Sequence, residues 1–385
     1  MYGKKYLFSP GPVLVSQRVK NSLLHPDICH RGPDFMAMMD SIQEKLIRLF
    51  RADSEYVGLV VSGSGTAANE AVLSSILTEG EKILLITNGE FGERLDEIVE
   101  KHNIPKTILR YKWGGYPKVA DVEEALKADP AIGLVAMVFH ETSTGMINPV
   151  HEVGEVVARY GRNLMIDAVS AIGGEDVNVL RDNIDFCTGV ANKAVGGLPG
   201  TSFICARRSV LEKRRAAARP RTVYLDIYKH LDFFDQMRQT PNTPNVSLFF
   251  ALDAALEEIL SEGLENRFAR YRRCAEILRS GIKELGLKLL LSDEHTSNTV
   301  TSAFLPEGIE IDEFCELMEK KGIVIYPGKR HLKAENMFQV ANMGTIDERL
   351  CRMFLIILRE TLEELGYEIK EPEEQELRSI KVAAS

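Results

Sequence analysis

The stretch MIDAVSAIGG, from Met165 to Gly174, places an aspartate at the end of an apolar run that is typical of a buried strand. A buried carboxylate is costly unless a positive charge or hydrogen-bond donors accompany it. Asp167 is therefore expected to meet a cationic partner. The identity of that partner is the main functional question that this stretch raises.

Five further apolar runs accompany this stretch, and helical periodicity fills most of the segments between them. We predict strands at 56–63, 82–89, 132–140, 163–169, 184–190 and 201–207. Strands that alternate with helices form a largely parallel sheet. We therefore predict an α/β fold with its functional side chains just beyond the carboxyl ends of the strands.

From Val246 the pattern changes to a long helical stretch, broken near Gly263, and then to short strands and helices. Thr345 and Glu348 have the spacing of a capping box at the start of the last helix. A smaller α+β domain is indicated, as expected for a chain longer than about 300 residues. We divide the chain into an N-terminal segment (1–15), a large domain (16–250), a small C-terminal domain (251–368) and a polar tail (369–385).

Composition favours a cytoplasmic protein with small-molecule partners. The 47 basic and 56 acidic residues give a formal net charge of −9 and form no basic block, so neither a nucleic-acid partner nor a membrane surface is expected. Neither a leader peptide nor a membrane-spanning apolar run of about 18 residues is recognisable. The six cysteines are scattered without metal-ligand spacing, so we predict mostly buried, reduced thiols and no metal site.

Lys193 lies in the turn ANKAVGGLPG after another predicted strand, where small neighbours would let a flat ligand approach its amine. A single lysine in such a turn is most often a solvated surface charge. Together with Asp167, however, it supplies the two groups that pyridoxal phosphate requires, an acid on the ring nitrogen and a lysine on the aldehyde. Asp167 would keep that nitrogen protonated, and Lys193 would hold the aldehyde and later move a proton.

The segment SGSGTAANEA, from Ser62 to Ala71, offers a phosphate site. Backbone amides and the hydroxyls of Ser64 and Thr66 at a helix N-terminus are suited to an anion, although an ordinary serine-capped turn gives the same pattern. The spacing matches neither a dinucleotide fingerprint nor a Walker loop. Phe91 in NGEFGERL could stack on a flat ring, although such a residue is more often part of a core.

Eight motifs in order resemble the class V, fold-type I pyridoxal phosphate aminotransferases and cover about Lys5 to Leu365. They are FSPGPV, SGSGTAANEA, NGEFGERL, HETSTGMINP, IDAVSAIGG, ANKAVGGLPG, QTPNTPNVSLFFAL and VIYPGK. Within that family they are most similar to 2-aminoethylphosphonate:pyruvate aminotransferases, with alanine:glyoxylate aminotransferases as close relatives. The resemblance implies transamination between 2-aminoethylphosphonate and an α-keto acid such as pyruvate. An alanine/serine:glyoxylate-type reaction is the alternative.

The resemblance also implies a role for each matching position. Ser64, Gly65 and Thr66 would cradle the cofactor phosphate, and Phe91 would stack on the ring. Thr142 would contact the ring on its hydroxyl side, Asp167 would contact the ring nitrogen, and Lys193 would form the Schiff base with the cofactor aldehyde. Thr243 would reach the phosphate of a neighbouring subunit, which implies a homodimer with shared active sites. The segment from Ser9 to Pro12 would lie by the active-site entrance.

The chain departs from the family in its small domain, where an arginine usually binds the substrate carboxylate. The matching motif is FQVANMG, so that position is Gln339, and a neutral amide lacks the charge and fork of a guanidinium. A substitute cation could come from Arg330, or from Lys329 or Lys333 behind it. A different anion site could involve His30 and Arg31. Alternatively, the acceptor or the reaction has changed, for example to that of a lyase.

Several of these residues also have ordinary structural explanations, and the sequence argues against two other protein classes. Arg330 and Lys333 could be solvated loop charges, and His30 with Arg31 could only fix their own segment. A cysteine desulfurase would need a nucleophilic cysteine in a mobile loop, and none of the six has that setting. A non-catalytic binding protein would have little reason to retain both Asp167 and Lys193.

Overall fold

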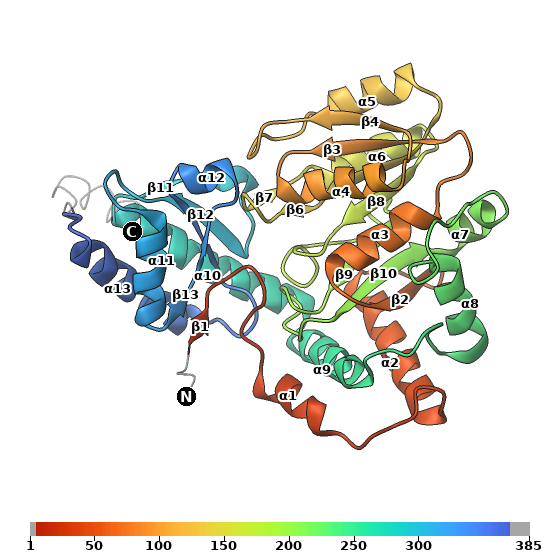
Figure 1. Ribbon diagram of the computed structural model, residues 1–385, viewed down its shortest axis with the longest axis horizontal. Coiled ribbons are helices and arrows are strands. Elements are labelled where there is room, and N and C mark those ends of the chain that lie inside the picture. The colour runs from red at the N-terminus through yellow and green to blue at the C-terminus, as the bar shows by residue number, and fades with distance from the viewer. Residues whose placement is uncertain (1–4, 370–385) are drawn as a thin grey trace.

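The computed structural model describes residues 5–369. Its centre is a seven-stranded sheet with the strand order β2-β10-β9-β8-β5-β3-β4 (Figure 1). The strands are β2 (Tyr56–Ser62), β3 (Lys82–Thr87), β4 (Lys106–Arg110), β5 (Ile132–Val138), β8 (Asn163–Asp167), β9 (Phe186–Val190) and β10 (Thr201–Arg207). Strand β10 runs antiparallel to both of its neighbours, and the other pairs are parallel. The six predicted strands and the largely parallel sheet are confirmed, whereas β4 was not predicted.

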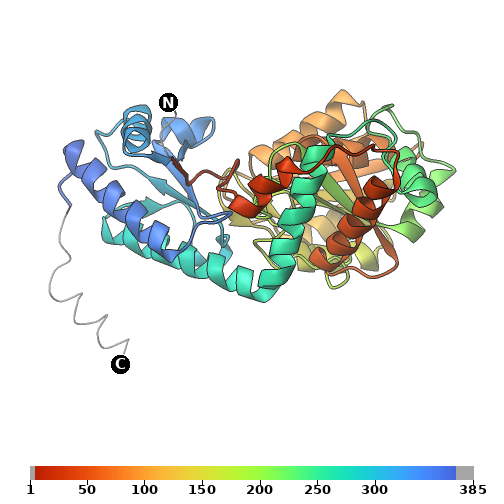
Figure 2. The ribbon, with the colours of Figure 1, turned by 90° about the horizontal axis from the view of Figure 1, so that it is seen from below.

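Helices wrap this sheet because their apolar faces pack against its buried strands (Figures 1 and 2). Helix α3 packs on β9 and β10, and α4 packs on β3 and β5. The helices of this large domain are α1 (Gln17–Asn21), α2 (Pro33–Leu49), α3 (Gly65–Ser75), α4 (Glu90–Lys101), α5 (Val119–Ala128), α6 (Val150–Arg159), α7 (Arg208–Arg215), α8 (Ile227–Met237) and α9 (Val246–Glu262). A short hairpin follows β5 and is made of β6 (His140–Glu141) and β7 (Met146–Ile147).

The small domain carries an antiparallel sheet in the order β11-β12-β15-β14. Its strands are β11 (Lys288–Leu289), β12 (Val300–Phe304), β14 (Tyr326–Pro327) and β15 (Met337–Ala341), and its helices are α10 (Leu264–Glu284), α11 (Ile311–Lys320), α12 (His331–Ala334) and α13 (Glu348–Glu364). The predicted break at Gly263 is confirmed, since this residue separates α9 from α10 with a φ of 83°. Strand β1 (Tyr6–Leu7) pairs with β13 (Ile323–Val324), so the N-terminal segment joins the small domain.

Two large hydrophobic clusters correspond to the two sheets. One extends from Val19 to Ile259, and the other combines Phe8 with buried residues from Cys274 to Leu362. Helix α9 spans the boundary predicted after residue 250 and belongs to the first cluster. The domain bounds remain predictions, and residues 370–385 of the predicted tail lie outside the described part of the chain.

Two local predictions have different outcomes. The capping box was wrong, because Asp347 caps α13 by accepting a hydrogen bond from the Leu350 amide. Four cysteines are buried, Cys315 is partly buried and Cys29 is exposed, which confirms mostly buried free thiols. Within residues 5–369, no helix is long and apolar enough to cross a membrane.

Candidate active site

Five of the predicted site residues follow the carboxyl ends of parallel strands. Asp167 ends β8, and Lys193 follows β9. Ser64 follows β2, Phe91 lies in the helix after β3, and Thr142 follows β5. This edge is where α/β sheets bind ligands. The topology therefore brings these side chains to one end of the large domain.

Asp167 is buried and held by hydrogen bonds on both carboxylate oxygens. The Val169 amide donates to Oδ1 at 2.9 Å, and the Asn69 amide donates to Oδ2 at 2.6 Å. Asn69 in turn accepts a hydrogen bond from the Thr188 hydroxyl at 2.6 Å. Burial raises the pKa of Asp167, while these donors and the nearby charge of Lys193 oppose that rise. Within residues 5–369 the carboxylate makes no direct ion pair, so it can accept a cationic ligand.

Lys193 is covered by the N-terminal segment. Its Nζ atom donates a hydrogen bond to the Pro10 carbonyl oxygen. A Cβ atom on Gly11 would lie 2.8 Å from Cδ of Lys193, so only glycine allows this close approach. Burial lowers the pKa of Lys193 to about 8. The amine is therefore close to the pKa that general-base catalysis favours near neutral pH.

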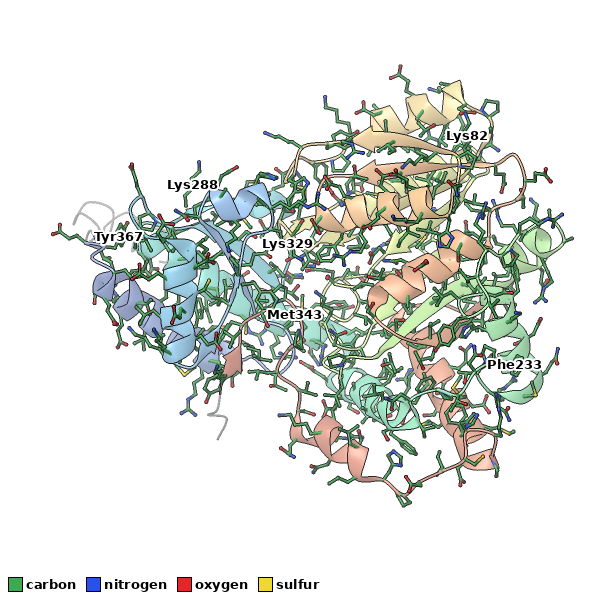
Figure 3. The ribbon with its side chains drawn as sticks, in the orientation of Figure 1. Lys82, Phe233, Lys288, Lys329, Met343 and Tyr367 are labelled. Carbon is green, nitrogen blue, oxygen red and sulfur yellow. The ribbon has the colours of Figure 1, made fainter. Side chains whose placement is uncertain are left out.

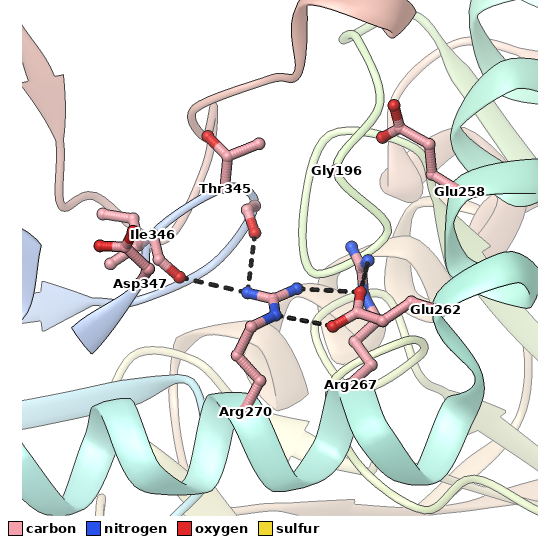
Figure 4. A pocket seen from close by; sticks show the side chains of 9 residues that line it. Gly196, Glu258, Glu262, Arg267, Arg270, Thr345, Ile346 and Asp347 are labelled. Atoms are coloured by element: carbon pink, nitrogen blue, oxygen red, sulfur yellow. Dashed lines mark hydrogen bonds and ion pairs between the residues drawn. The ribbon is translucent and has the colours of Figure 1, made fainter. Parts of the chain in front are cut away.

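Helix α10 fixes the turn that follows Lys193. Arg267 donates to the carbonyl oxygens of Ala194 and Val195 at 2.8 and 3.1 Å, and the Tyr271 hydroxyl donates to Ala194 at 3.0 Å. Figure 4 shows Arg267 and Arg270 beside Glu262, with Arg270 also bonded to the loop at 344–346. The lysine turn and the small domain are thereby tied to one helix.

Phe91 is positioned by a buried carboxylate that sequence analysis did not single out. The amides of Phe91 and Gly92 donate to Glu141, as do the amide and hydroxyl of Ser143. Glu141 is fully buried, and burial raises its pKa. A Cβ atom on Gly89 would lie 2.4 Å from Cδ of Glu141, so the carboxylate sits directly against the start of α4. Only the fold reveals this contact.

The predicted phosphate turn opens helix α3. Ser64 is the N-cap residue by position and is exposed, yet its side chain makes no capping hydrogen bond with any described residue. Gly65 begins the helix, and a Cβ atom there would lie 2.6 Å from Cγ2 of Val169. The amide end of α3, including Thr66, therefore packs beside the segment that follows Asp167. Unpaired first-turn amides are suited to an anion.

Gln339 connects the small domain to this site. It is 1% exposed, and its amide donates to the Thr142 carbonyl oxygen at 2.7 Å and to the Ser302 hydroxyl at 3.0 Å. The Thr142 hydroxyl shares a hydrogen bond with Ser170. His140 lies beside them, and burial lowers its pKa to about 3, so its ring is neutral. Its Nε2 atom has no partner among the described residues.

Two lysines and an arginine surround the Phe91 ring. Lys193 Nζ lies 5.8 Å from the ring centroid, Lys329 Nζ lies at 5.5 Å, and the Arg94 guanidinium lies at 4.8 Å. Figure 3 shows Lys329 where the two domains meet. Arg330 instead pairs with Glu90 and Glu93, and Lys333 pairs with Asp312 at 2.8 Å. Of the candidate cations in this loop, Lys329 is the one that faces Phe91.

The other predicted residues gather elsewhere. Arg31 donates to the Gln239 side chain at 2.8 Å and to the Thr240 carbonyl oxygen at 2.9 Å. Thr243 is exposed, and its hydroxyl lies 3.5 Å from Nε2 of His30. Arg31 and His30 thus hold the loop that carries Thr243. None of their described contacts is with Lys193 or Asp167.

Comparison with known proteins defines the family. The sequence model for "Aminotransferase class-V" matches residues 15–364. The chain belongs to this family. An uncharacterized aminotransferase of Methanocaldococcus jannaschii is 36% identical over 369 residues, which cover 96% of this chain and 95% of the relative. A 2-aminoethylphosphonate–pyruvate transaminase of Lysinibacillus sphaericus is 34% identical over 347 residues, which cover 89% and 93%.

Solved structures of the family share the fold. Ureidoglycine-glyoxylate aminotransferase from Bacillus subtilis has a TM-score of 0.89 at 29% identity, with 96% of each chain covered. Alanine–glyoxylate aminotransferase from Nostoc sp. has a TM-score of 0.87 at 26% identity, with 94% of this chain and 96% of the other covered. The fold-type I architecture predicted from the sequence is confirmed.

The protein is a pyridoxal phosphate-dependent aminotransferase, and its residues fit this cofactor. Asp167 is a buried carboxylate without a direct cationic partner within residues 5–369, and Lys193 is a largely buried amine of lowered pKa. His140 leaves an unpaired buried nitrogen, and α3 presents its amide end beside Val169. The bound cofactor supplies an electron sink for the substrate carbanion.

Proposed function

We propose that this aminotransferase exchanges the amino group between 2-aminoethylphosphonate and an α-keto acid such as pyruvate, giving phosphonoacetaldehyde and alanine. The single observation that carries the proposal is the cluster of Lys193, Lys329 and Arg94 around Phe91. Both substrates are anionic, so one pocket with positive charge serves both half-reactions. Relatives that are 34% identical and bear this transaminase name support the choice.

In this proposal Asp167 stabilises the protonated ring nitrogen, and Lys193 holds the cofactor and moves the substrate proton. Ser64, Gly65 and Thr66 bind the phosphate through hydroxyls and amides. Phe91 stacks on one face of the ring, and Thr142 lies on its hydroxyl side. The lowered pKa of Lys193 supports its role because a neutral amine accepts a proton more readily than an ammonium ion.

The substrate anion is assigned to Lys329. Gln339 carries no charge, and its amide already donates to Thr142 and Ser302. Arg330 is engaged by two carboxylates and Lys333 by a third, whereas Lys329 faces Phe91. A lysine ammonium is a compact point charge with rotatable donors, so it suits a phosphonate as well as a carboxylate.

We further propose a cytoplasmic homodimer with shared active sites. Thr243 is exposed on a loop fixed by Arg31 and His30, outside the cluster around Lys193. In a dimer this loop would reach the neighbouring subunit's cofactor phosphate. Arg31 then acts on the site by holding this loop and does not bind substrate within its own subunit.

A second candidate is an alanine/serine:glyoxylate-type transamination. Solved glyoxylate aminotransferases with TM-scores of 0.87 and 0.89 are consistent with this choice.

Absorbance of the bound cofactor separates the candidates. The purified yellow enzyme is mixed separately with 2-aminoethylphosphonate, alanine, serine and glutamate, and loss of the visible band is followed. Rapid loss with 2-aminoethylphosphonate and alanine is the expected result. Loss with alanine or serine alone would replace the phosphonate assignment with the glyoxylate-type reaction. Release of ammonia without conversion of the cofactor would indicate a lyase.

A further inference from the structure

A cluster of charged and aromatic side chains fastens the loop before α12 to the start of α4. We call this cluster the α4 clamp, and it consists of Arg330, Glu90, Glu93 and Trp113. Arg330 Nε lies 2.7 Å from Oε2 of Glu90, and Nη1 donates to Oε2 of Glu93 at 2.7 Å. The guanidinium also lies 5.8 Å from the Trp113 ring centroid. The Trp113 indole N–H donates to Oε1 of Glu93 at 2.9 Å, which closes the cluster.

Both chain segments that form the α4 clamp, the start of α4 and the loop before α12, also carry a residue of the proposed anion site. Phe91 follows Glu90 in the first turn of α4, and Lys329 precedes Arg330 in the small-domain loop. Lys329 Nζ lies 5.5 Å from the Phe91 ring centroid. The clamp therefore joins the element that carries the aromatic ring to the element that carries the ammonium group.

The backbone at Arg330 supports a specific role for this contact. Its φ of 47° and ψ of −123° are unfavourable for a residue with a side chain. Such a conformation persists only where the surrounding contacts impose it, and it is concentrated at functional sites. The side chain of Arg330 makes two ion pairs and the Trp113 contact, and its carbonyl oxygen accepts a hydrogen bond from the Lys333 amide at 3.1 Å.

Charge gives the α4 clamp a second effect. Glu90 and Glu93 begin the helix next to Phe91, and Arg330 neutralises part of their charge. Without the guanidinium, the two carboxylates would repel an incoming anion and would attract Lys329 and Arg94, which lies 3.7 Å from Glu90. The ammonium group would then be drawn away from the substrate.

We propose that Arg330 is a positioning residue that holds Lys329 over Phe91 and shields the anionic substrate from Glu90 and Glu93. This inference rests on the proposed anion-binding role of Lys329. Arg330 does not contact the substrate and acts through its neighbour. Binding of the anionic substrate therefore depends on a contact between the two domains that lies outside the pocket.

The test compares Arg330→Ala, Arg330→Gly and Arg330→Lys with the matched control Lys333→Ala. Lys333 lies in the same segment, and Lys333→Ala also removes an ion pair. The partner in that pair is Asp312, which is not part of the α4 clamp. The Ala and Gly variants should raise the KM for the anionic amine and keto acid by roughly tenfold, with kcat changed less than about threefold. Arg330→Lys should recover part of the loss, and Lys333→Ala should resemble the wild type.

The Gly variant separates the effect of the side chain from that of the backbone, because it relieves the backbone strain while removing the guanidinium. Equal KM effects in the Gly and Ala variants support the side-chain contact. A Gly variant that behaves like the wild type would show that only the backbone matters and would overturn the proposal. Urea unfolding midpoints identify any variant that is simply destabilised.

Trp113 is the only tryptophan in the chain, so its fluorescence reports on the clamp directly. In the holoenzyme, the emission of wild type and Lys333→Ala should be the same and should change in Arg330→Ala. Unchanged emission together with unchanged KM in Arg330→Ala would overturn the proposal. These measurements use whichever amine converts the wild-type cofactor. Failure of 2-aminoethylphosphonate to do so would reject the proposed substrate without deciding the role of Arg330.

Discussion

Replacing Asn69 with alanine should weaken cofactor binding without touching any group proposed to contact the cofactor. Asn69 supplies one of the two hydrogen bonds that Asp167 accepts, at 2.6 Å, and its own oxygen accepts the Thr188 hydroxyl at 2.6 Å. The variant would leave the carboxylate with only the Val169 amide. Because the site is buried, no solvent replaces the lost donor without cost.

The expected loss of cofactor affinity follows from the charge of the acceptor, the Asp167 carboxylate. A hydrogen bond to a charged group contributes about 1.5 to 3 kcal/mol, which corresponds to about 10- to 150-fold in an equilibrium constant. Loss of this donor also raises the pKa of Asp167, because the Asn69 bond is one of the interactions that oppose the effect of burial. A carboxyl group that is more often protonated holds a cationic ring nitrogen less tightly.

Cofactor affinity is measured by absorbance titration of the cofactor-free protein at several pH values. Asn69→Ala should bind about 10- to 150-fold more weakly at neutral pH, with a larger deficit at lower pH. Thr188→Val is the matched control, because it removes only the outer hydrogen bond and should cost no more than about tenfold. Wild-type affinity and pH dependence in a folded Asn69→Ala protein would refute this reasoning.

Three further substitutions test the site. The pKa of Lys193 in the folded protein is about 8, below its ordinary 10.5. The charged amine therefore lowers the free energy of unfolding by its full amount below pH 8, and this cost disappears as the pH rises to 10.5. Urea unfolding of cofactor-free Lys193→Met should therefore show about 2 to 3 kcal/mol of added stability at pH 7, narrowing toward pH 10.5, with transaminase activity abolished. Gln339→Arg should lower the KM for pyruvate about tenfold if the family's carboxylate geometry is retained, and an unchanged KM would place the carboxylate elsewhere. Glu141→Ala should lower the unfolding free energy by about 2 kcal/mol, because the amides of Phe91 and Gly92 lose their buried acceptor, and an unchanged urea midpoint would contradict this.

The large sheet could be predicted because its buried strands appear in the sequence as apolar runs between helical segments. Strand β4 was missed because its residues are only partly buried or exposed and so give no apolar run. The start of α13 was placed too early, since the capping-box spacing of Thr345 and Glu348 is also compatible with a helix capped by Asp347. Local patterns therefore identify an element more reliably than its ends.

Candidate site residues could be named from the sequence where a residue type is itself informative, as with an aspartate that ends one buried strand and a lysine that follows the next strand of the same sheet. Asn69 and Glu141 gave no such signal, because their partners are distant in the sequence and only the fold brings them together. The different contacts of Lys329 and Arg330 could not be predicted from the sequence either. They depend on a small-domain loop meeting α4, which no local pattern encodes.

Transfer of a nitrogen label tests the central claim most directly. The enzyme with bound cofactor is incubated with nitrogen-labelled 2-aminoethylphosphonate and pyruvate, and the products are followed by NMR. The account predicts labelled alanine and an equal amount of phosphonoacetaldehyde, with neither formed by Lys193→Ala. Unlabelled alanine, or label released as ammonia, would contradict it.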